Sequence, residues 1–225
     1  MPTLLITGAN RGLGYALAEA YANDGWDVIA TSRSEEAKVP ANCQHRVLDL
    51  ADLDAIPEFA EQLGDQPIDL LWNNAGIYPD KNLALNEISN HTWMSAFMVN
   101  SLAPVRIAAA LQGNVARSEQ KLMVFTSTIM SSLSLNGSAA YAYRSSKAAL
   151  NMAVRCLAKD YEAAGICTLM LHPGHVRTEM GGAEGAIDIT TSINGMRDLI
   201  AAITPQERDQ FHNSLRSYDG SVIPW

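Results

Sequence analysis

The sequence predicts an α/β protein in which helices cover both faces of a mostly parallel β-sheet. Short apolar segments of strand length alternate with longer segments of helical character, and a glycine-rich turn follows the first strand segment. This alternation favours parallel strands joined by right-handed helical crossovers. The chain has 225 residues without an internal repeat or a linker-like tract, which predicts a single domain over residues 1–225.

The periodicity indicates the following elements in chain order. The expected strands are Leu4–Thr7, Asp27–Thr31, Gln44–Leu48, Ile68–Trp72, Lys121–Thr126 and Cys167–His172. The expected helices cover about 12–24, 52–64, 87–112, 143–164 and 191–203. The Gly181–Gly185 segment breaks the pattern and predicts a loop over 181–190, and Thr204–Glu207 has the capping-box residues of a short helix. Asp219-Gly220 predicts a turn before the last residues.

Composition excludes several classes of protein. Hydrophobic residues make up 48% and charged residues 18%, which supports a sizeable core and argues against intrinsic disorder. The formal net charge of −8 argues against nucleic acid or an anionic membrane as the main partner. The cysteines Cys43, Cys156 and Cys167 have no CxxC spacing, and no His/Cys/Asp cluster predicts a metal site.

The amino-terminal segment predicts no targeting signal. It lacks the basic region of a signal peptide, and no apolar stretch of the chain approaches the ~20 residues of a membrane span. We therefore expect a soluble, cytoplasmic protein that does not associate with membranes.

The glycine-rich turn after the first strand predicts a dinucleotide site. Glycines permit a tight turn and a close approach to a pyrophosphate, and the following helix offers free amides and the positive end of its dipole. The spacing is G-x-x-x-G-x-G, and its context of strand, turn and helix favours cofactor binding over a plain tight turn. The candidate residues are Gly8, Asn10, Arg11, Gly12, Leu13 and Gly14.

The end of the second strand indicates which dinucleotide is bound. An NAD site usually has Asp or Glu at this position, whereas this chain reads Ala30-Thr31-Ser32-Arg33. Arg33 and Arg11 are suited to bind a 2′-phosphate together, which predicts NADP(H) rather than NAD(H). The alternative is that both arginines are solvated.

Tyr143 and Lys147 form a candidate catalytic pair. Residues four positions apart lie on one face of a helix, and none of the other six tyrosines has a lysine four residues later. A lysine ammonium would stabilise the tyrosinate and lower the tyrosine pKa from about 10. Such a pair alone is also compatible with an ordinary surface helix.

The motifs in this order resemble those of the short-chain dehydrogenase/reductases. They are the Thr7–Gly14 turn, Asn73-Asn74-Ala75-Gly76, Tyr143-x-x-x-Lys147 and Pro173-Gly174-His175-Val176-Arg177-Thr178. The resemblance covers nearly the whole chain. Within the family, Tyr141–Met152 and Tyr218–Trp225 are similar to the C-factor and sniffer-type carbonyl reductase branch. The resemblance implies a Rossmann fold with a doubly wound sheet, and a substrate loop with small helices over 179–215.

The resemblance also implies a Ser-Tyr-Lys triad with an asparagine as its fourth member. Tyr143 matches the general acid, Lys147 the residue that binds the nicotinamide ribose, and Asn100 the asparagine that holds a relay water. The usual serine position, thirteen residues before the tyrosine, is Met130 here. The longer spacing of the C-factor branch places the serine at Ser127, with Thr128 and Ser131 as alternatives. The end of a parallel strand faces the ligand crevice, which agrees with Ser127.

Further cofactor contacts follow from the same resemblance. Asp49 matches a carboxylate that contacts adenine, although it is also suited to cap a helix. Pro173-Gly174 resembles the turn that seats the nicotinamide carboxamide, and His175 is placed to line the substrate pocket. The remaining cofactor residues implied are Leu50, Asn74, Ala75, Gly76, Tyr143, Lys147, Val176 and Thr178.

These observations predict an NADP(H)-dependent carbonyl reductase, or the reverse alcohol oxidation. Ile77, Tyr78, Leu133, Leu135, Met180 and Ile187 predict a mostly apolar substrate pocket. A dinucleotide-binding regulatory protein of C-factor type is the main alternative, and dehydration or epimerisation on the same fold is a third. We expect a homodimer or homotetramer, although apolar Leu150, Val154 and Leu157 would serve equally as core.

Overall fold

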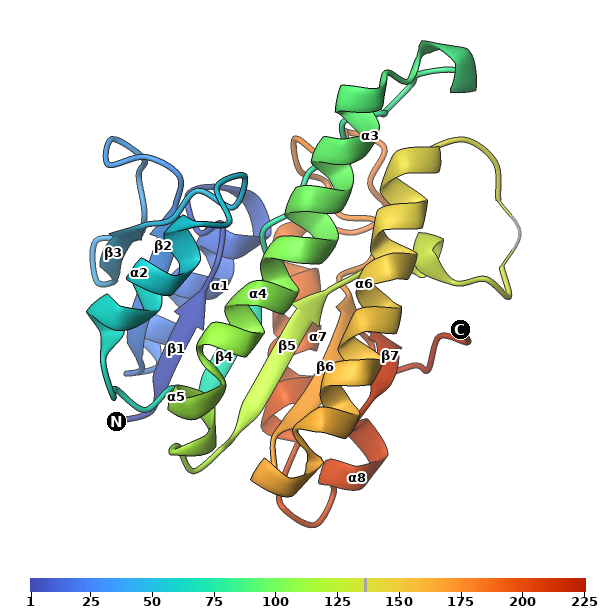
Figure 1. Cartoon of the computed structure of the whole chain (residues 1–225). Coiled ribbons are helices and arrows are strands. Elements are labelled where there is room, and N and C mark those ends of the chain that lie inside the picture. The colour runs from blue at the N-terminus through green and yellow to red at the C-terminus, as the bar shows by residue number, and fades with distance from the viewer. Residues whose placement is uncertain (136) are drawn as a thin grey trace.

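The computed structural model describes residues 1–135 and 137–225 and contains a seven-stranded parallel sheet (Figure 1). The strand order is β3-β2-β1-β4-β5-β6-β7, and every neighbouring pair is parallel. The winding direction reverses between β1 and β4, which confirms the doubly wound topology and places a ligand crevice at the carboxyl ends of these strands. The strands are β1 (Thr3–Ile6), β2 (Asp27–Ser32), β3 (Gln44–Val47), β4 (Leu70–Asn73), β5 (Leu122–Thr126), β6 (Cys167–His172) and β7 (Ser214–Ser217).

Helices cover both faces of the sheet, as the sequence predicts. One buried cluster lies between the sheet and α2, α4 and α6, and the other between the sheet and α1 and α7. Leu150, Val154 and Leu157 of α6 belong to the first cluster, so they are core residues. The helices are α1 (Gly12–Asn23), α2 (Ala55–Leu63), α3 (Asn90–Phe97), α4 (Ala103–Ala110), α5 (Gln112–Ala116), α6 (Tyr141–Asp160), α7 (Ile189–Ala201) and α8 (Arg208–Phe211).

The strands are apolar because both of their faces are covered. Successive side chains of a strand point to opposite faces, so Leu4 and Ile6 of β1 lie in the cluster with α1 while Leu5 lies in the cluster with α4. Burying a leucine or isoleucine side chain stabilises the fold by about 1.5–3 kcal/mol. The central strands therefore form a rigid base for the residues at their ends.

The single helix expected over 87–112 is interrupted. The chain forms α3, then a π-helical segment at Met98–Leu102, and then α4. Pro104 has no amide to donate to the carbonyl of residue 100, and its ring would clash with that carbonyl in a regular helix. The Ala103 amide instead bonds to the Met98 carbonyl, five residues back. The expectation of one continuous helix is therefore wrong.

The carboxyl-terminal segment contains a strand that the sequence does not predict. β7 extends the sheet beside β6, with Leu215 in register with Met170. Its sequence, Ser-Leu-Arg-Ser, includes a single apolar residue and gives little periodicity. The Thr204 hydroxyl accepts the Glu207 amide at 3.3 Å, as a capping box requires, although the regular helix α8 covers only Arg208–Phe211.

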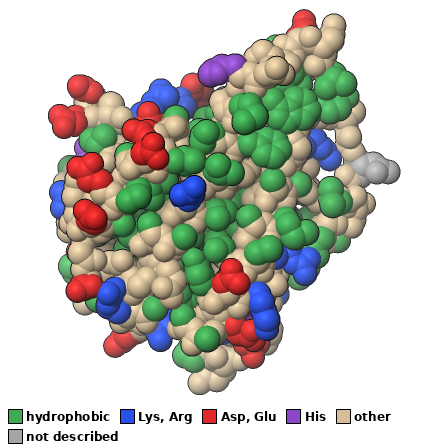
Figure 2. Space-filling view, viewed as in Figure 1, with side chains coloured by type: hydrophobic (Ala, Val, Ile, Leu, Met, Phe, Trp, Pro, Cys, Tyr) green, Lys and Arg blue, Asp and Glu red, His purple; other side chains and the backbone are tan. Residues whose placement is uncertain are grey.

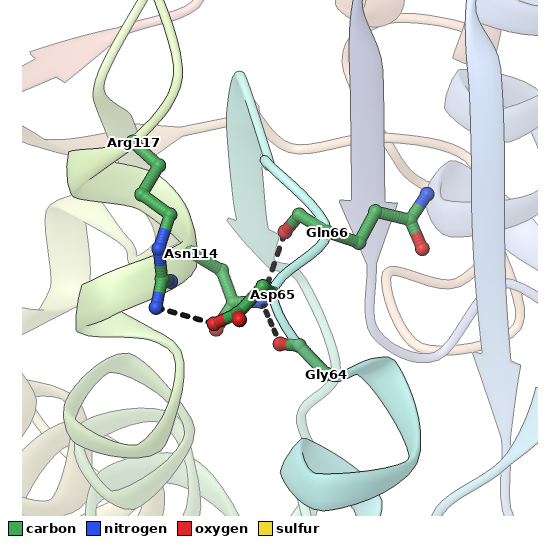
Figure 3. A network of polar contacts seen from close by, with 5 residues as sticks. All are labelled: Gly64, Asp65, Gln66, Asn114 and Arg117. Carbon is green, nitrogen blue, oxygen red and sulfur yellow. Dashed lines mark hydrogen bonds and ion pairs between the residues drawn. The ribbon is translucent and has the colours of Figure 1, made fainter.

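A polar network secures the amino end of β4, at the edge of the sheet opposite the crevice. Asn114 of α5 donates from its amide nitrogen to the carbonyls of Gly64 and Gln66, both at 2.8 Å (Figure 3). Arg117 and Asp65 form an ion pair at 2.5 Å beside it.

Within the described ranges, no helix combines the length and apolar character that crossing a membrane would require.

Candidate active site

The glycine-rich turn between β1 and α1 forms a tight cradle. Gly8 and Gly12 have φ values of 69° and 55°, which favour glycine. A Cβ on Gly8 would lie 2.9 Å from the Cβ of Ala75, and one on Gly14 would clash with the Gly8 carbonyl oxygen. A side chain would therefore clash at Gly8 and Gly14. Gly8 and Gly12 also have the backbone conformation that favours glycine.

Thr7 and Asn74 join this turn to the loop after β4. The Thr7 hydroxyl accepts the backbone amides of Asn74 and Ala75 at 3.0 and 3.1 Å. The Asn74 side chain donates to the carbonyls of Thr7 and Gly8 at 3.0 and 3.3 Å. Thr7 is a structural residue of the site that the motif analysis did not single out, and the turn is held in shape by these bonds.

The residues present fit a dinucleotide. Among the residues that the structure describes, no side chain caps the amino end of α1, where Arg11 occupies the cap position. The amides of this turn are thus available to a pyrophosphate, and the dipole of the 12-residue helix favours the negative charge. Asn10, Gly12 and Leu13 lie in this segment, and Thr178 approaches Gly12 from the facing loop, with its methyl 4.0 Å from where a Cβ would lie.

The arginines expected at a 2′-phosphate differ in their contacts. Arg33 is exposed immediately after β2. Arg11 forms a 2.5 Å ion pair with Glu179, and both side chains are exposed. An exposed ion pair contributes little stability, so it leaves Arg11 available to a phosphate. Ser32, at the end of β2, has its hydroxyl 2.7 Å from Nε2 of His45.

Lys147 and Asn100 converge on Gly76, in the loop after β4. Tyr143 lies one helical turn before Lys147 on α6. A Cβ on Gly76 would lie 3.4 Å from the Lys147 Nζ and 3.2 Å from the Asn100 Oδ1. Lys147 is 3% exposed, and its Nζ donates to the Thr126 carbonyl at 2.8 Å. Because glycine has no side chain, position 76 leaves room for both Lys147 and Asn100 beside the cofactor cradle.

The side chain of Asn100 is fixed by three hydrogen bonds. Its Oδ1 accepts the Ile77 amide at 2.8 Å, and its Nδ2 donates to the Ile77 carbonyl at 2.9 Å and to the Ser146 hydroxyl at 3.0 Å. Asn100 lies in the π-helical segment caused by Pro104. The irregular turn thus places a buried amide between the loop after β4 and helix α6.

Burial moves the pKa values of the tyrosine and the lysine apart. It raises the pKa of Tyr143 to about 12, while the side-chain hydrogen bond with Thr128 lowers it and the nearby Tyr78 raises it. Burial lowers the pKa of Lys147 to about 8. Desolvation is the largest influence on the tyrosine, and the expectation that Lys147 lowers its pKa stays a prediction. Tyr143 is protonated at neutral pH, which is the form that a proton donor needs.

Three hydroxyl residues, Ser127, Thr128 and Ser131, follow β5. Ser127 donates its hydroxyl to the Asn151 Oδ1 at 2.7 Å, and Asn151 donates to the Ser131 hydroxyl at 2.7 Å. The Thr128 side chain lowers the pKa of Tyr143, and its hydroxyl accepts the Met130 amide at 3.2 Å. Ser127 as the catalytic serine stays a prediction, and these contacts favour its alternative, Thr128. Ser127 and Ser131 instead support the backbone next to Thr128.

The other predicted cofactor residues are dispersed around the crevice. Asp49 accepts the Ala51 amide at 3.0 Å within the turn before α2, whose cap position is Asp54, and Leu50 is buried in the core. Gly174 has a φ of 87° in the turn after β6, and a Cβ there would lie 2.6 Å from Ile187. Val176 pairs with Ile187 in an isolated bridge, and the ring of His175 contacts the Gly181 carbonyl at 3.0 Å. The loop from Thr178 is thus joined to the Pro173-Gly174 turn.

The doubly wound fold and this arrangement are those of a Rossmann-type oxidoreductase, and comparison with known proteins identifies the family. The family described as short chain dehydrogenase matches residues 2–187, so the chain belongs to the short-chain dehydrogenase family. The C-signal protein of Myxococcus xanthus is 34% identical over 168 residues, which span 74% of this chain and 98% of that protein.

Solved structures agree with this assignment. Carbonyl reductase Sniffer of D. melanogaster aligns with a TM-score of 0.89 and 28% identity, over 100% of both chains. A carbonyl reductase from Pseudomonas aeruginosa PAO1 in complex with NADP aligns with a TM-score of 0.82 and 33% identity, also over 100% of both chains. The predicted resemblance to the C-factor and sniffer-like branch is confirmed.

Proposed function

We propose that the protein is an NADPH-dependent carbonyl reductase that converts an aldehyde, ketone or quinone-like carbonyl to an alcohol, or catalyses the reverse reaction. The approach of Lys147 and Asn100 to Gly76, beside the nucleotide cradle and one helical turn from Tyr143, carries this proposal. The similarity to a carbonyl reductase in complex with NADP supports it.

Each residue has a distinct role in this proposal. The nicotinamide cofactor, when bound, supplies the hydride for the carbonyl carbon. Thr128 donates a hydrogen bond to the carbonyl oxygen, where negative charge develops. Tyr143 transfers its phenolic proton to that oxygen, which completes the alcohol. Lys147 stabilises the resulting tyrosinate and binds the ribose, and Asn100 holds the water through which the phenol regains a proton from solvent.

NADP(H) rather than NAD(H) is the proposed cofactor. Arg33 and Arg11 supply cationic groups near the end of β2, where an NAD enzyme usually has a carboxylate. Gly8, Asn10, Gly12, Leu13 and Gly14 bind the pyrophosphate. Asp49, Leu50 and the loop of Asn74, Ala75 and Gly76 would hold the adenosine. Pro173, Gly174, Val176 and Thr178 would hold the nicotinamide.

In this proposal the protein acts in the cytoplasm. The segment 179–215 forms the substrate loop and its small helices. The pocket is lined by apolar side chains that include Ile77, Leu133, Leu135, Met180 and Ile187. Leu135 and Met180 are partly exposed, as a ligand surface requires. A small carbonyl or alcohol with an apolar body is therefore the expected substrate.

A homodimer or homotetramer is the proposed assembly. Hydrophobic side chains gather on the surface over α3, α4 and α6 (Figure 2). Met94 of α3 and Met152 of α6 are each 63% exposed, and Leu102, which precedes α4, is also an exposed hydrophobic residue. Light scattering should give a multiple of the 24.3 kDa chain mass for the wild type and a lower mass for Met94→Glu with Met152→Glu. A wild-type monomer would contradict this assembly.

A signalling role without turnover is the second candidate, because the relative from M. xanthus is named C-signal. A regulatory protein needs the nucleotide cradle but has no use for a proton donor supported by a buried lysine. The buried Lys147, beside Asn100 at the same glycine and one helical turn from Tyr143, therefore favours the enzyme.

The first test is NADPH consumption with a panel of aldehydes, ketones, dicarbonyls and quinones. Tyr143→Phe is assayed beside the wild type, and NADPH affinity is measured for both. We expect turnover in the wild type, its loss in the variant, and similar NADPH affinity. Tight NADPH binding without turnover of any carbonyl in the panel would favour the signalling role.

A further inference from the structure

Helix α6, which carries Tyr143 and Lys147, begins without a cap from its own neighbourhood. Ala139 and Ala140 precede it with left-handed φ values of 60° and 54°, a conformation unfavourable for alanine. Neither alanine has a side-chain acceptor for the free amides of the first helical turn. The start of this helix therefore needs a partner from elsewhere in the chain.

Asp80, in the segment after β4, is that partner. Its Oδ2 accepts the Ala142 amide at 2.8 Å, and its Oδ1 accepts the Tyr143 amide at 3.2 Å. The Asp80 side chain is buried, with 1% of the residue exposed. A carboxylate at this end of a helix also interacts favourably with the helix dipole. The backbone of Tyr143 is thus held by a residue 63 positions earlier in the chain.

Tyr78, two residues before Asp80, contacts the ring of the same tyrosine. The rings of Tyr78 and Tyr143 are stacked, with centroids 4.3 Å apart and an interplanar angle of 18°. Such a contact restricts the rotation of the Tyr143 side chain, because a change of rotamer would break the stack. One short segment therefore contacts both the backbone and the ring of Tyr143.

The other end of this segment is fixed by Asn100. Its amide group makes two hydrogen bonds to the backbone of Ile77, at 2.8 and 2.9 Å. Ile77 is followed directly by Tyr78, so the ring that stacks on Tyr143 extends from an immobilised backbone. Asn100, Tyr78 and Asp80 form a continuous set of contacts from the π-helical turn to the start of α6.

We propose that Asp80 and Tyr78 are positioning residues for Tyr143, which hold its backbone and its ring where proton transfer requires them. This inference rests on the proposed function, since it takes Tyr143 as the proton donor. A displacement of about 1 Å in a reacting group can lower a rate by about 100-fold. The proposal therefore predicts an effect on turnover and not on NADPH affinity.

The test compares substitutions that differ in which contact they retain. Asp80→Ala removes both acceptors, and Asp80→Asn keeps one while it places an amide donor against the other backbone amide. We expect kcat to fall by about 10–100-fold in Asp80→Ala and by less in Asp80→Asn, with the Kd for NADPH nearly unchanged. Tyr78→Ala should lower kcat by about 10-fold, whereas Tyr78→Phe, which keeps the stack, should restore nearly wild-type turnover.

Ser89→Ala is the matched control for loss of a helix cap. The Ser89 hydroxyl accepts the Thr92 amide at 3.0 Å at the start of α3, so this substitution destabilises a helix without touching Tyr143. It should lower Tm and leave kcat unchanged. In a Tyr143→Phe background, Asp80→Ala should cause no further loss of the residual turnover, because both substitutions act through the same phenol.

The outcomes separate this inference from the proposed function. Wild-type turnover in Tyr143→Phe would refute the proposed proton donor itself. An inactive Tyr143→Phe together with unchanged kcat in Asp80→Ala and Tyr78→Ala would overturn the positioning roles alone. If Asp80→Ala does not fold, Asp80→Asn and the two Tyr78 variants decide the question, and equal kcat in Tyr78→Ala and Tyr78→Phe would count against it.

Discussion

Pro104 lies four residues after Asn100, and this spacing explains the π-helical turn that places the asparagine in the site. A regular helix would direct the carbonyl of Asn100 at the amide that Pro104 lacks. The turn widens at Met98–Leu102 instead, and the Asn100 side chain bonds to Ile77 and Ser146. An irregularity in the helix is thus part of the active-site geometry.

Replacement of this proline should affect turnover more than stability. Pro104→Ala restores the amide and permits a regular helix, which would rotate Asn100 away from Ile77. We expect kcat to fall by about 10-fold or more, since misplaced site residues lower rates steeply. The Tm should change little, because a restored helical bond offsets the lost ring. Unchanged kcat in a folded Pro104→Ala would show that the proline does not determine the site.

Thr128 and Ser127 should respond differently when each loses its hydroxyl. Thr128→Val keeps the shape of the side chain and should lower kcat by about 100-fold, whereas Thr128→Ser should retain turnover. Ser127→Ala removes the donor to Asn151 and should lower stability by about 1 kcal/mol with a small effect on kcat. Steady-state kinetics and thermal melts of the three variants measure this. If Ser127→Ala instead lowers kcat more than Thr128→Val does, Ser127 would be the residue that binds the substrate carbonyl.

Lys147 should contribute to activity at the expense of stability. Burial lowers its pKa to about 8, which corresponds to a penalty on the order of 3 kcal/mol for holding the charged amine in the fold at pH 7. Lys147→Met should therefore abolish turnover and raise Tm at pH 7. The lost bond to the Thr126 carbonyl will offset part of that gain.

The Tm difference should also depend on pH. Between pH 8 and about 10.5 the unfolded wild-type chain binds a proton that the folded chain has released, so wild-type stability rises with pH in this range. The Tm advantage of Lys147→Met should accordingly shrink from pH 7 to pH 9.5. Thermal melts at the two pH values measure it, and a constant difference would contradict a depressed lysine pKa.

Arg33 should determine the preference for NADPH. A charge-assisted hydrogen bond to a phosphate is worth about 1.5–3 kcal/mol, so Arg33→Ala should weaken NADPH binding by about 10–100-fold. NADH binding should not change, because NADH lacks the 2′-phosphate. Arg117→Ala, whose arginine pairs with Asp65 at the opposite edge of the sheet, is the control and should affect neither cofactor. Equal wild-type affinity for the two cofactors would contradict the assignment.

The fold follows from the sequence wherever burial is periodic. The strand expected at Cys167–His172 has the observed bounds, and the other five predicted strands agree within two residues or so. β7 is not predictable from periodicity, because this edge strand has a single apolar residue. The break in the helix over 87–112 had a signal in Pro104, which periodicity alone does not weigh.

The site was predictable where a motif fixes the position along the chain. Tyr143 and Lys147 share one helix, so their spacing settles their relation. Ser127 and Thr128 are adjacent after a strand, and spacing does not determine which hydroxyl meets the tyrosine. Asp80 lies 62 positions before Ala142, and their contact at the start of α6 is one that only the folded chain specifies.

Transfer of deuterium from NADPH labelled at the reactive hydrogen tests the central claim most directly. The best carbonyl from the panel is incubated with wild type and with Tyr143→Phe, and the alcohol product is weighed by mass spectrometry. We predict one deuterium per product molecule with the wild type and almost no product with Tyr143→Phe, although both bind NADPH. Unlabelled product, or equal labelled product from the two proteins, would contradict hydride transfer supported by Tyr143.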